Sequence, residues 1–197
     1  MPQKLVVLRN CGVIDPQDVD SYLARGGFEA LRRVQSGMTP AEVVEEVRGS
    51  GLRGRGGGGF PTGLKWEQTA VSPGERKYII CNASEGEVGA FKDRYILERD
   101  PFTLIEGVVI AGYAVGASQA YIYLRSEYAY LVPLLMNAIP QVKQKGLLGI
   151  AGQSFEIELR LGTGGYVCGE ETAMMIDDEV FGDLTPERVP EILARYR

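Results

Sequence analysis

The sequence predicts an α/β fold: a small parallel Rossmann-like sheet flanked by helices, with an N-terminal helical segment before it. Three short apolar runs are typical of strands, and amphipathic stretches lie between them. The runs cover residues 77–83, 120–125 and 155–161. Strands that alternate with helices along a chain pair in parallel through right-handed crossovers. Ligands of such sheets bind at the carboxyl ends of the strands, so the loops there are the first candidates for a site.

Helix-start signals define the N-terminal helical segment, which we assign to residues 1–50. Asp15-Pro16 predicts a helix that continues to about Val34, because aspartate is a good N-cap and proline suits the first helical position. Thr39-Pro40-Ala41-Glu42 has the pattern of a capping box and predicts a second helix. A further short helix is expected over residues 64–70.

Two longer helices are expected between the strands. An Asp-Pro cap at residues 100–101 begins the first, which contains the most apolar stretch, residues 104–117, interrupted by Glu106. That stretch is too short to span a bilayer and predicts a buried helix. Its small residues, which would permit close packing, are Gly107, Ala111, Gly112 and Ala114. Residues 127–145 are expected to be mostly helical, with Pro133 bending the helix or marking its start.

The composition is that of a globular protein and argues against several functional classes. The 197 residues are 45% hydrophobic with a net charge of −5, so nucleic acid is not an expected partner. The absence of histidine removes the commonest general base and zinc ligand. Cys11, Cys81 and Cys168 form no C-x-x-C pair, so we expect neither a metal site nor a disulfide framework, and a reduced cytoplasmic setting. We expect contact with a membrane only peripherally, through partners.

The first chemical motif is the glycine-rich segment GLRGRGGGGFPTGLKW, residues 51–66. It matches G-x-G-x-x-G, but a helix rather than a strand is predicted before it, against the dinucleotide-binding context, and Leu64 occupies the position of the Walker A lysine. The segment still predicts a backbone cradle for an anion, with Arg53, Arg55 and Lys65 supplying positive charge. Phe60 is placed where a flat ring could stack on it. A tight glycine turn is the alternative interpretation.

The second motif is CNASEGEVGAFKDRY, residues 81–95, which follows the first predicted strand. Asn82, Glu85 and Glu87 could bind ribose hydroxyls, flavin or phosphate. Paired acids also suit glycoside hydrolysis or a metal site, and a solvated acidic loop is equally compatible with the composition. The third motif, GTGGYVCGEETA at residues 162–173, combines glycines with Tyr166 and an acidic pair at the start of a predicted helix.

Together these three segments, in this order and spacing, resemble the NADH-oxidising flavoprotein subunit of respiratory complex I. The related modules of NAD-linked hydrogenases and formate dehydrogenases share them. The resemblance covers about Arg9 to Ala173 and implies an FMN- and NADH-binding α/β domain at residues 51–173. It implies hydride transfer from NADH to FMN, with onward electron transfer to iron–sulfur partners. Because the flavin carries that chemistry, no catalytic side chain is expected.

The resemblance also implies which residues bind the cofactor and the substrate. The expected FMN-binding residues are Gly54, Arg55, Gly56, Gly57, Lys65, Asn82, Glu85, Tyr166, Gly169, Glu170 and Glu171. Phe60 and Glu87 are expected to contact NADH. Ser84 stands where relatives commonly have aspartate, and Gln68 where they often have a phenylalanine that stacks on the dinucleotide. Both departures predict looser binding of FMN or NADH.

Family members continue beyond the third motif into a further FMN-contacting segment, a ubiquitin-like domain and a helical domain with a [4Fe–4S] cluster. We therefore expect this chain to hold no iron–sulfur cluster. Residues 174–197 instead resemble the end of the thioredoxin-like [2Fe–2S] partner subunit: a hairpin turning at Asp177-Asp178, then a helix from Thr185-Pro186. We interpret the chain as a fusion of pieces of two proteins of the complex, natural or engineered.

Two functional hypotheses follow. The first is an NADH dehydrogenase module that binds FMN, oxidises NADH and reduces iron–sulfur subunits of a complex I or hydrogenase assembly. The second is a non-catalytic remnant or interaction fragment with weak or no flavin binding. The colour of the purified protein, yellow or not, distinguishes them.

Overall fold

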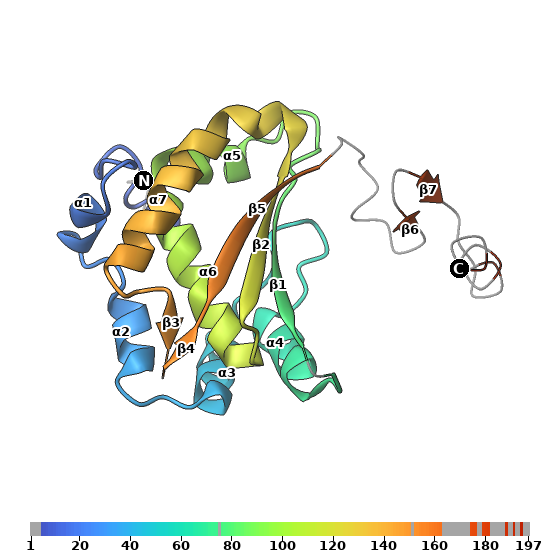
Figure 1. Ribbon diagram of the computed structural model, residues 1–197, viewed down its shortest axis with the longest axis horizontal. Coiled ribbons are helices and arrows are strands. Elements are labelled where there is room, and N and C mark those ends of the chain that lie inside the picture. The colour runs from blue at the N-terminus through green and yellow to red at the C-terminus, as the bar shows by residue number, and fades with distance from the viewer. Residues whose placement is uncertain are drawn as a thin grey trace.

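The computed structural model describes residues 5–74, 76–150, 152–162, 174–176, 179–181, 188, 191 and 194. It confirms the predicted α/β fold (Figure 1). The strands β1 (Tyr78–Ala83), β2 (Gln119–Arg125) and β5 (Glu156–Gly162) form a parallel sheet in the order β1-β2-β5. All three strands lie within two residues of their predicted positions. Their carboxyl ends meet at one edge of the sheet, where the predicted site loops begin.

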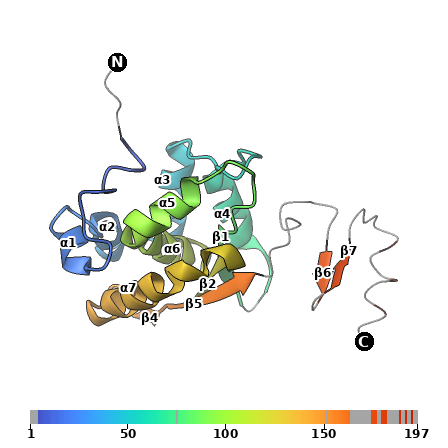
Figure 2. The same cartoon turned by 90° about the horizontal axis from the view of Figure 1, so that it is seen from above.

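Both crossovers cover the same face of the sheet. The first contains α5 (Lys92–Arg99) and α6 (Pro101–Val115). The second contains the 3₁₀ helix η1 (Ser126–Leu131), α7 (Val132–Gln144) and a small hairpin of β3 (Gly149–Ile150) and β4 (Gln153–Ser154). Figures 1 and 2 show α6 and α7 on one side of the strands, as expected for sequential strands joined by crossovers of one hand.

The side chains of β2 show how differently the two faces are covered. Ala120, Ile122 and Leu124 are fully buried against the helices, whereas Tyr121 and Tyr123 on the other face are half-buried. The predicted alternation of β5 holds at its start, where Ile157 is buried, but fades at Leu161, which is 51% exposed.

Helix α6 lies at the centre of the molecule. It contacts β1 and β2 on one side and α2, α3 and α4 on the other. The predicted close packing is confirmed at Gly112, where a Cβ atom would lie 2.2 Å from the ring of Phe155. It is not confirmed at Gly107, where a Cβ would meet nothing within 4 Å. The apolar sequence of this helix thus reflects burial on nearly every side.

The N-terminal segment corrects one prediction. Instead of one helix from Asp15 to Val34, the chain forms α1 (Val19–Leu23), capped by Asp18, and α2 (Glu29–Gln35). The chain turns between them through Gly26, with φ of +79°, and Phe28, with φ of +61°. A left-handed conformation is costly for a residue with a large side chain, so tertiary contacts must hold Phe28 in place.

The other helix starts predicted before residue 150 are confirmed, at residues 100–101 among others. Helix α3 (Pro40–Gly49) begins with the complete capping box of Thr39 and Glu42. Helix α4 (Thr62–Val71) begins two residues before its predicted start. Pro133 lies in the first turn of α7 and so marks the start of that helix.

A buried polar network holds the N-terminal segment against α6. The carboxylate of Glu106 accepts hydrogen bonds from Tyr22 Oη at 2.6 Å, Phe28 N at 2.9 Å and Leu31 N at 3.1 Å. It therefore stabilises the left-handed Phe28 and caps the start of α2. Burial, followed by the hydrogen bond to Glu106, raises the pKa of Tyr22 well above its usual range. Asp100, at 1% exposure, adds a link to Asn10 at 2.8 Å.

The tail contains part of the predicted hairpin. Strands β6 (Met174–Ile176) and β7 (Glu179–Phe181) pair antiparallel, as predicted for a turn at residues 177–178. The turn residues themselves lie outside the described residues, and so does most of the predicted terminal helix, of which the structure describes Arg188 and Glu191 as helical. Within the described residues, no helix is both long and apolar enough to cross a membrane.

We predict that Glu106→Ala lowers the free energy of unfolding by about 3–5 kcal/mol, because three donors lose their acceptor and a cavity forms. Urea denaturation followed by circular dichroism measures the change. Glu45→Ala is the control: Glu45 is exposed on α3, and its replacement should change stability by less than about 0.5 kcal/mol. Equal stability of the two variants would contradict the role given to Glu106.

Candidate functional site

The glycine-rich segment between α3 and α4 forms a narrow loop whose two arms are hydrogen-bonded to each other. The backbone N–H of Gly54 donates to the carbonyl of Phe60 at 2.9 Å, and Arg53 Nε donates to the carbonyl of Gly59 at 2.6 Å. These bonds close the base of the loop and leave residues 55–58 as an exposed tip. The loop is therefore ordered by its own backbone rather than by burial.

The glycines of the tip serve two different purposes. Gly57 and Gly59 have φ angles of +118° and +59°, so the turn itself requires glycine there. Gly56 and Gly58 have no positive φ, and a Cβ added to either would meet nothing within 4 Å. The fold gives no reason for glycine at these two positions. A ligand that approaches the backbone closely would explain the two glycines, because a side chain there would keep the ligand away. This favours an anion-binding loop over a simple glycine turn.

Two of the three predicted positive charges of the loop have no internal partner among the described residues. Arg55 is exposed at the tip, and Lys65 is exposed in the first turn of α4. Neither side chain has a hydrogen bond or ion pair within the part of the chain that the structure describes. Phe60, which is 47% exposed, adds an accessible ring at the end of the loop. Two cations, a helix start without a side-chain cap and an aromatic face suit a phosphate-bearing aromatic ligand.

A close contact between α3 and α4 holds the base of the loop. A Cβ atom on Gly63 would lie 2.4 Å from Cα of Arg48, so the two helices approach at glycine. Arg48 also donates from Nη1 to both oxygens of Glu67 at 3.0 Å. The helices that flank the loop are thus fixed to one another at its base.

We predict that Gly63→Ala destabilises the protein by about 1–3 kcal/mol, because the added methyl group forces the two helices apart. Gly49→Ala is the matched control, since Gly49 ends α3 and a Cβ there would meet nothing within 4 Å. Alanine at Gly49 should leave stability unchanged or raise it. Thermal unfolding of both variants tests this, and equal melting temperatures would show that the contact at Gly63 is unimportant.

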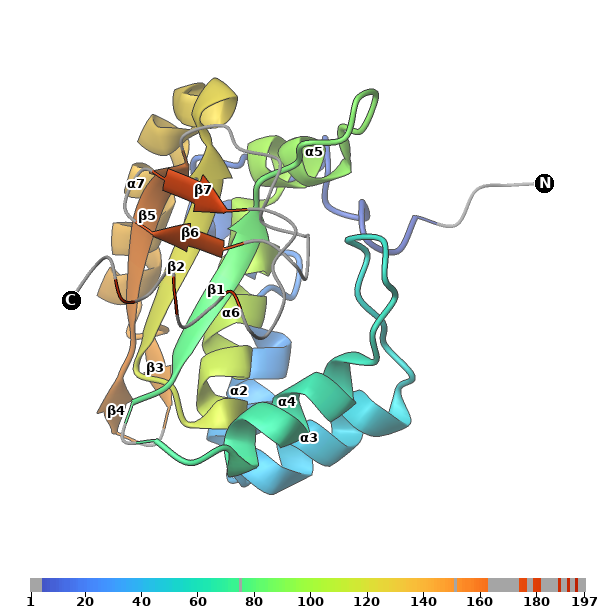
Figure 3. The ribbon, with the colours of Figure 1, turned by 90° about the vertical axis from the view of Figure 1, so that its right-hand side faces the viewer.

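The second part of the site is the acidic loop, residues 84–91, at the carboxyl end of β1. Asn82, the last residue but one of β1, has an exposed side chain whose Oδ1 accepts the N–H of Ser84 at 2.9 Å. Glu87 is exposed near the middle of the loop. Figure 3 shows the glycine loop rising toward this loop on the β1 side of the sheet. The two predicted motifs therefore lie on one side of the molecule.

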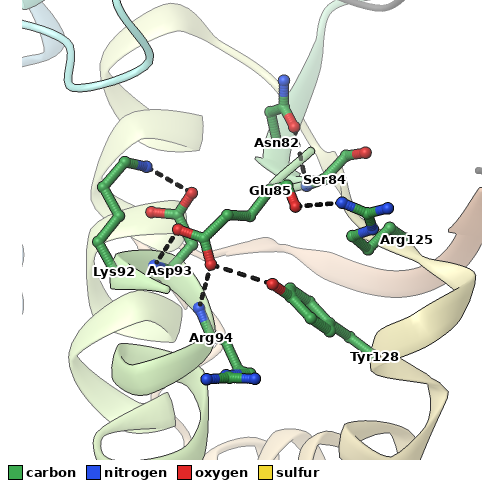
Figure 4. A network of polar contacts seen from close by, with 8 residues as sticks. All are labelled: Asn82, Ser84, Glu85, Lys92, Asp93, Arg94, Arg125 and Tyr128. Atoms are coloured by element: carbon green, nitrogen blue, oxygen red, sulfur yellow. Dashed lines mark hydrogen bonds and ion pairs between the residues drawn. The ribbon is translucent and has the colours of Figure 1, made fainter. Parts of the chain in front are cut away.

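Glu85 differs from the other predicted site residues that the structure describes because it is buried, with 5% exposure. Its carboxylate accepts hydrogen bonds from the backbone N–H of Asp93 at 3.0 Å and of Arg94 at 3.3 Å, in the first turn of α5 (Figure 4). A third bond comes from the hydroxyl of Tyr128 at 3.1 Å. Glu85 therefore caps the start of α5, although it lies 8 and 9 residues before the two amides that it accepts from, and it joins that helix to η1.

These contacts keep Glu85 ionised. Burial alone would raise its pKa, but the hydrogen bonds from the Asp93 and Arg94 backbone, from Tyr128, and the charge of Lys92 outweigh burial and lower the pKa below its ordinary value of 4.5. Conversely, burial and the hydrogen bond to Glu85 raise the pKa of Tyr128. The pair is therefore a carboxylate that accepts and a neutral phenol that donates.

Two residues of this network, Arg125 and Tyr128, were not singled out from the sequence. Arg125, the last residue of β2, donates from Nη1 to the carbonyl of Glu85. It also forms two hydrogen bonds with Glu127, which lower the pKa of that carboxyl to about 2. A cation at the end of a predicted strand and a phenol three residues later were a signal, since they fall at the ligand-binding edge.

The third predicted part lies mostly outside the described residues: Tyr166, Gly169, Glu170 and Glu171 are not among them. Gly162, the first residue of that motif, ends β5 and pairs with Arg125 of β2. The motif thus begins at the same edge of the sheet as the acidic loop. No group of histidine, cysteine, aspartate and glutamate side chains in the described ranges could hold a metal ion.

We predict that Glu85→Gln lowers the free energy of unfolding by about 1–3 kcal/mol at neutral pH, because the charged cap becomes neutral. Since folding lowers the pKa of Glu85, its contribution is complete above pH 4.5 and is lost as the pH falls through the lowered folded-state value. The wild-type protein and this variant should therefore converge in stability once the pH falls below the lowered folded-state pKa of Glu85. Urea titrations at a series of pH values from neutral to acid measure this, with Glu45→Gln as the exposed control. A difference that does not depend on pH would contradict the assignment.

Comparison with known families finds a match over residues 47–194 to the Nuo51 FMN-binding domain. The match includes the glycine loop and the acidic loop. Among curated proteins, an NADH-quinone oxidoreductase subunit of Rhizobium meliloti is 48% identical over 174 residues, which are 86% of this chain and 41% of the relative. The NADP-reducing hydrogenase protein HndC of Solidesulfovibrio fructosivorans is 48% identical over 88% of this chain and 36% of its own length.

Solved structures give the same result. A crystal structure of an NAD+-reducing [NiFe]-hydrogenase in the H2-reduced state superposes with a TM-score of 0.68 at 39% identity. The superposition covers 77% of this chain and 26% of the hydrogenase chain. This chain therefore spans well under half the length of these relatives.

Proposed function

Because this chain belongs to the Nuo51 FMN-binding domain family, we propose that it is an NADH dehydrogenase module that binds FMN and oxidises NADH. The observation that carries the proposal is the glycine loop, where Gly56 and Gly58 meet no protein atom that would exclude a side chain. Arg55 and Lys65, which are unpaired among the described residues, flank that loop. An anionic, flat cofactor fits the backbone, the charges and the exposed ring of Phe60.

The glycine loop would hold the phosphate end of FMN through the backbone N–H groups of Gly56 and Gly57 at its tip, with Arg55 and Lys65 offsetting the charge. Gly54, whose own N–H donates to Phe60, would line the base of the loop beside the ligand. Asn82 would offer its exposed amide at the carboxyl end of β1. Glu85 stays in the proposed set because a carboxylate with three internal hydrogen bonds retains a lone pair for another donor. Tyr166, Gly169, Glu170 and Glu171 complete the set through the family resemblance.

Phe60 and Glu87 are the proposed substrate contacts. The ring of Phe60 would stack on NADH, and the exposed Glu87 carboxylate would accept hydrogen bonds from its ribose hydroxyls. FMN, when bound, supplies the hydride acceptor. The protein holds donor and acceptor in contact and needs no side chain to move a proton, consistent with a chain that has no histidine.

The electron acceptor is proposed from the relatives. Their names place them in NADH-quinone oxidoreductases and hydrogenases. We propose that this chain, in the cytoplasm, passes electrons to iron–sulfur subunits of such an assembly, beginning with the thioredoxin-like [2Fe–2S] subunit. The alternative of a non-catalytic remnant is not favoured, since the family match includes both ordered loops of the site.

The absorption spectrum of the purified protein, with FMN added and then NADH under anaerobic conditions, tests the function. We expect a flavin band that bleaches when NADH is added, and FMN binding weaker than sub-micromolar because of Ser84. Protein that does not retain added FMN would overturn the proposal. A sub-micromolar dissociation constant for FMN in an equilibrium titration would contradict the expected weak binding but not the proposed function.

Gly56→Ala distinguishes a glycine loop that binds FMN from a glycine turn that binds no ligand. Its methyl group meets no protein atom within 4 Å, so stability should change by less than about 0.5 kcal/mol. FMN affinity should fall about tenfold or more, because the methyl group stands where the ligand must approach. Unchanged affinity would mean that FMN does not lie against the loop tip.

We predict that Glu87→Gln weakens NADH binding about tenfold while FMN retention changes less than twofold, because the carboxylate faces the substrate and not the flavin. NADH titration of the FMN-loaded protein and flavin fluorescence measure the two effects. Glu45→Gln serves as the control for loss of one exposed negative charge. Loss of FMN with NADH affinity intact would contradict this position for Glu87.

A further inference from the structure

The acidic loop that carries Glu87 has a single buried residue. Between Ser84 and Phe91 every side chain except that of Glu85 is exposed or half-buried, and Val88 is fully exposed. Exposed backbone with few buried contacts opens at low free energy. The conformation of this loop therefore depends strongly on whatever holds Glu85.

Two residues hold Glu85, one by its backbone and the other by its side chain. Arg125 donates to its backbone carbonyl, and Tyr128 donates to its carboxylate at 3.1 Å. The first is the last residue of β2, and the second lies in η1, which follows directly. Figure 4 shows both side chains reaching Glu85 from the β2 side while α5 meets it from the other. The loop is thus fixed between the sheet and a helix start.

The two residues are themselves held in the orientation this requires. Glu127 forms hydrogen bonds with the Arg125 guanidinium at 2.8 and 2.5 Å, and that guanidinium lies 5.9 Å from the centre of the Tyr128 ring. Tyr128 is 9% exposed. A guanidinium has a planar fork of donors, so fixing one side of it aims the other. Arg125 and Tyr128 therefore form a rigid clamp, and Glu85 is its target.

We propose that Arg125 and Tyr128 are positioning residues: through Glu85 they hold the acidic loop in the conformation in which Glu87 meets NADH. The inference rests on the proposed function for its consequence, but the clamp itself is a property of the protein alone. Neither residue needs to touch the nucleotide. Releasing Glu85 would free the loop and the first turn of α5, and binding would then have to reorder them.

Tyr128→Phe removes one hydroxyl from the clamp, and Tyr130→Phe is a closely matched control. Tyr130 lies two residues further along η1, and its hydroxyl also donates to a carboxylate, that of Glu98 in α5. Both variants thus remove a phenol–carboxylate bond made by η1, but the partner of Tyr128 lies in the acidic loop and the partner of Tyr130 lies in α5. Arg125→Lys is a second clamp variant, which keeps the charge and loses the fork.

The first measurement is amide hydrogen exchange of the ligand-free protein, resolved by NMR at Asp93 and Arg94. Tyr128→Phe should accelerate exchange there about tenfold, because Glu85 loses a hydrogen bond that holds it on these two amides. Tyr130→Phe should leave the exchange of both amides unchanged. Unchanged exchange in Tyr128→Phe, or equal acceleration in the two variants, would overturn the clamp.

The second measurement is steady-state NADH oxidation by the FMN-loaded protein, with ferricyanide added as the electron acceptor that reoxidises the flavin. The clamp variants should raise the KM for NADH about 3–10-fold and change kcat less than twofold, because the cost is paid in ordering the loop. Tyr130→Phe should match the wild type. If the clamp variants exchange the Asp93 and Arg94 amides faster but keep the wild-type KM for NADH, the clamp does not act on NADH binding and the proposal is overturned. A wild-type protein that exchanges as expected yet never oxidises NADH would refute the proposed function while supporting the clamp.

Discussion

Burial of two carboxylates on and beside α6 is the constraint on which the rest of the structure depends. Glu106 lies within the most apolar helix and accepts three hydrogen bonds from the N-terminal segment, while Asp100 holds Asn10 at the start of the helix. A charge buried without partners would be prohibitive, so the N-terminal segment must dock for α6 to be buried. The two events are therefore coupled in folding.

That constraint reaches the site because α6 connects its two halves. The glycine loop is carried by α3 and α4, and both helices contact α6. The acidic loop is carried by β1 and α5, which contact α6 from other sides. The relative placement of the glycine loop and the acidic loop is thus set by the packing of one central helix. A rigid scaffold beneath exposed loops is the usual way in which proteins keep binding residues in register.

The acidic residues discussed above divide into a buried group and an exposed one. Glu106, Asp100 and Glu85 are buried and hydrogen-bonded, and each organises backbone at a helix start. Glu87 is exposed on a loop at the edge of the sheet. Sequence alone shows identical side chains in both groups. Burial distinguishes the residues that hold the fold from the exposed Glu87, which is a proposed substrate contact. Glu85 belongs to the buried group by geometry and is a proposed cofactor contact by resemblance.

The sequence by itself determined the strands, the parallel sheet, the capping box at Thr39, and the start of α7 at Pro133, because these depend on neighbours a few residues away. The break between α1 and α2 was decided by tertiary structure, since Glu106 stabilises the left-handed Phe28 from 78 residues along the chain. The roles of Arg125 and Tyr128 were decided in the same way: their partner Glu85 lies 40 and 43 residues away and meets them only when β1 and β2 pair. Local patterns record period and capping, whereas a buried hydrogen bond between distant residues leaves no periodic trace.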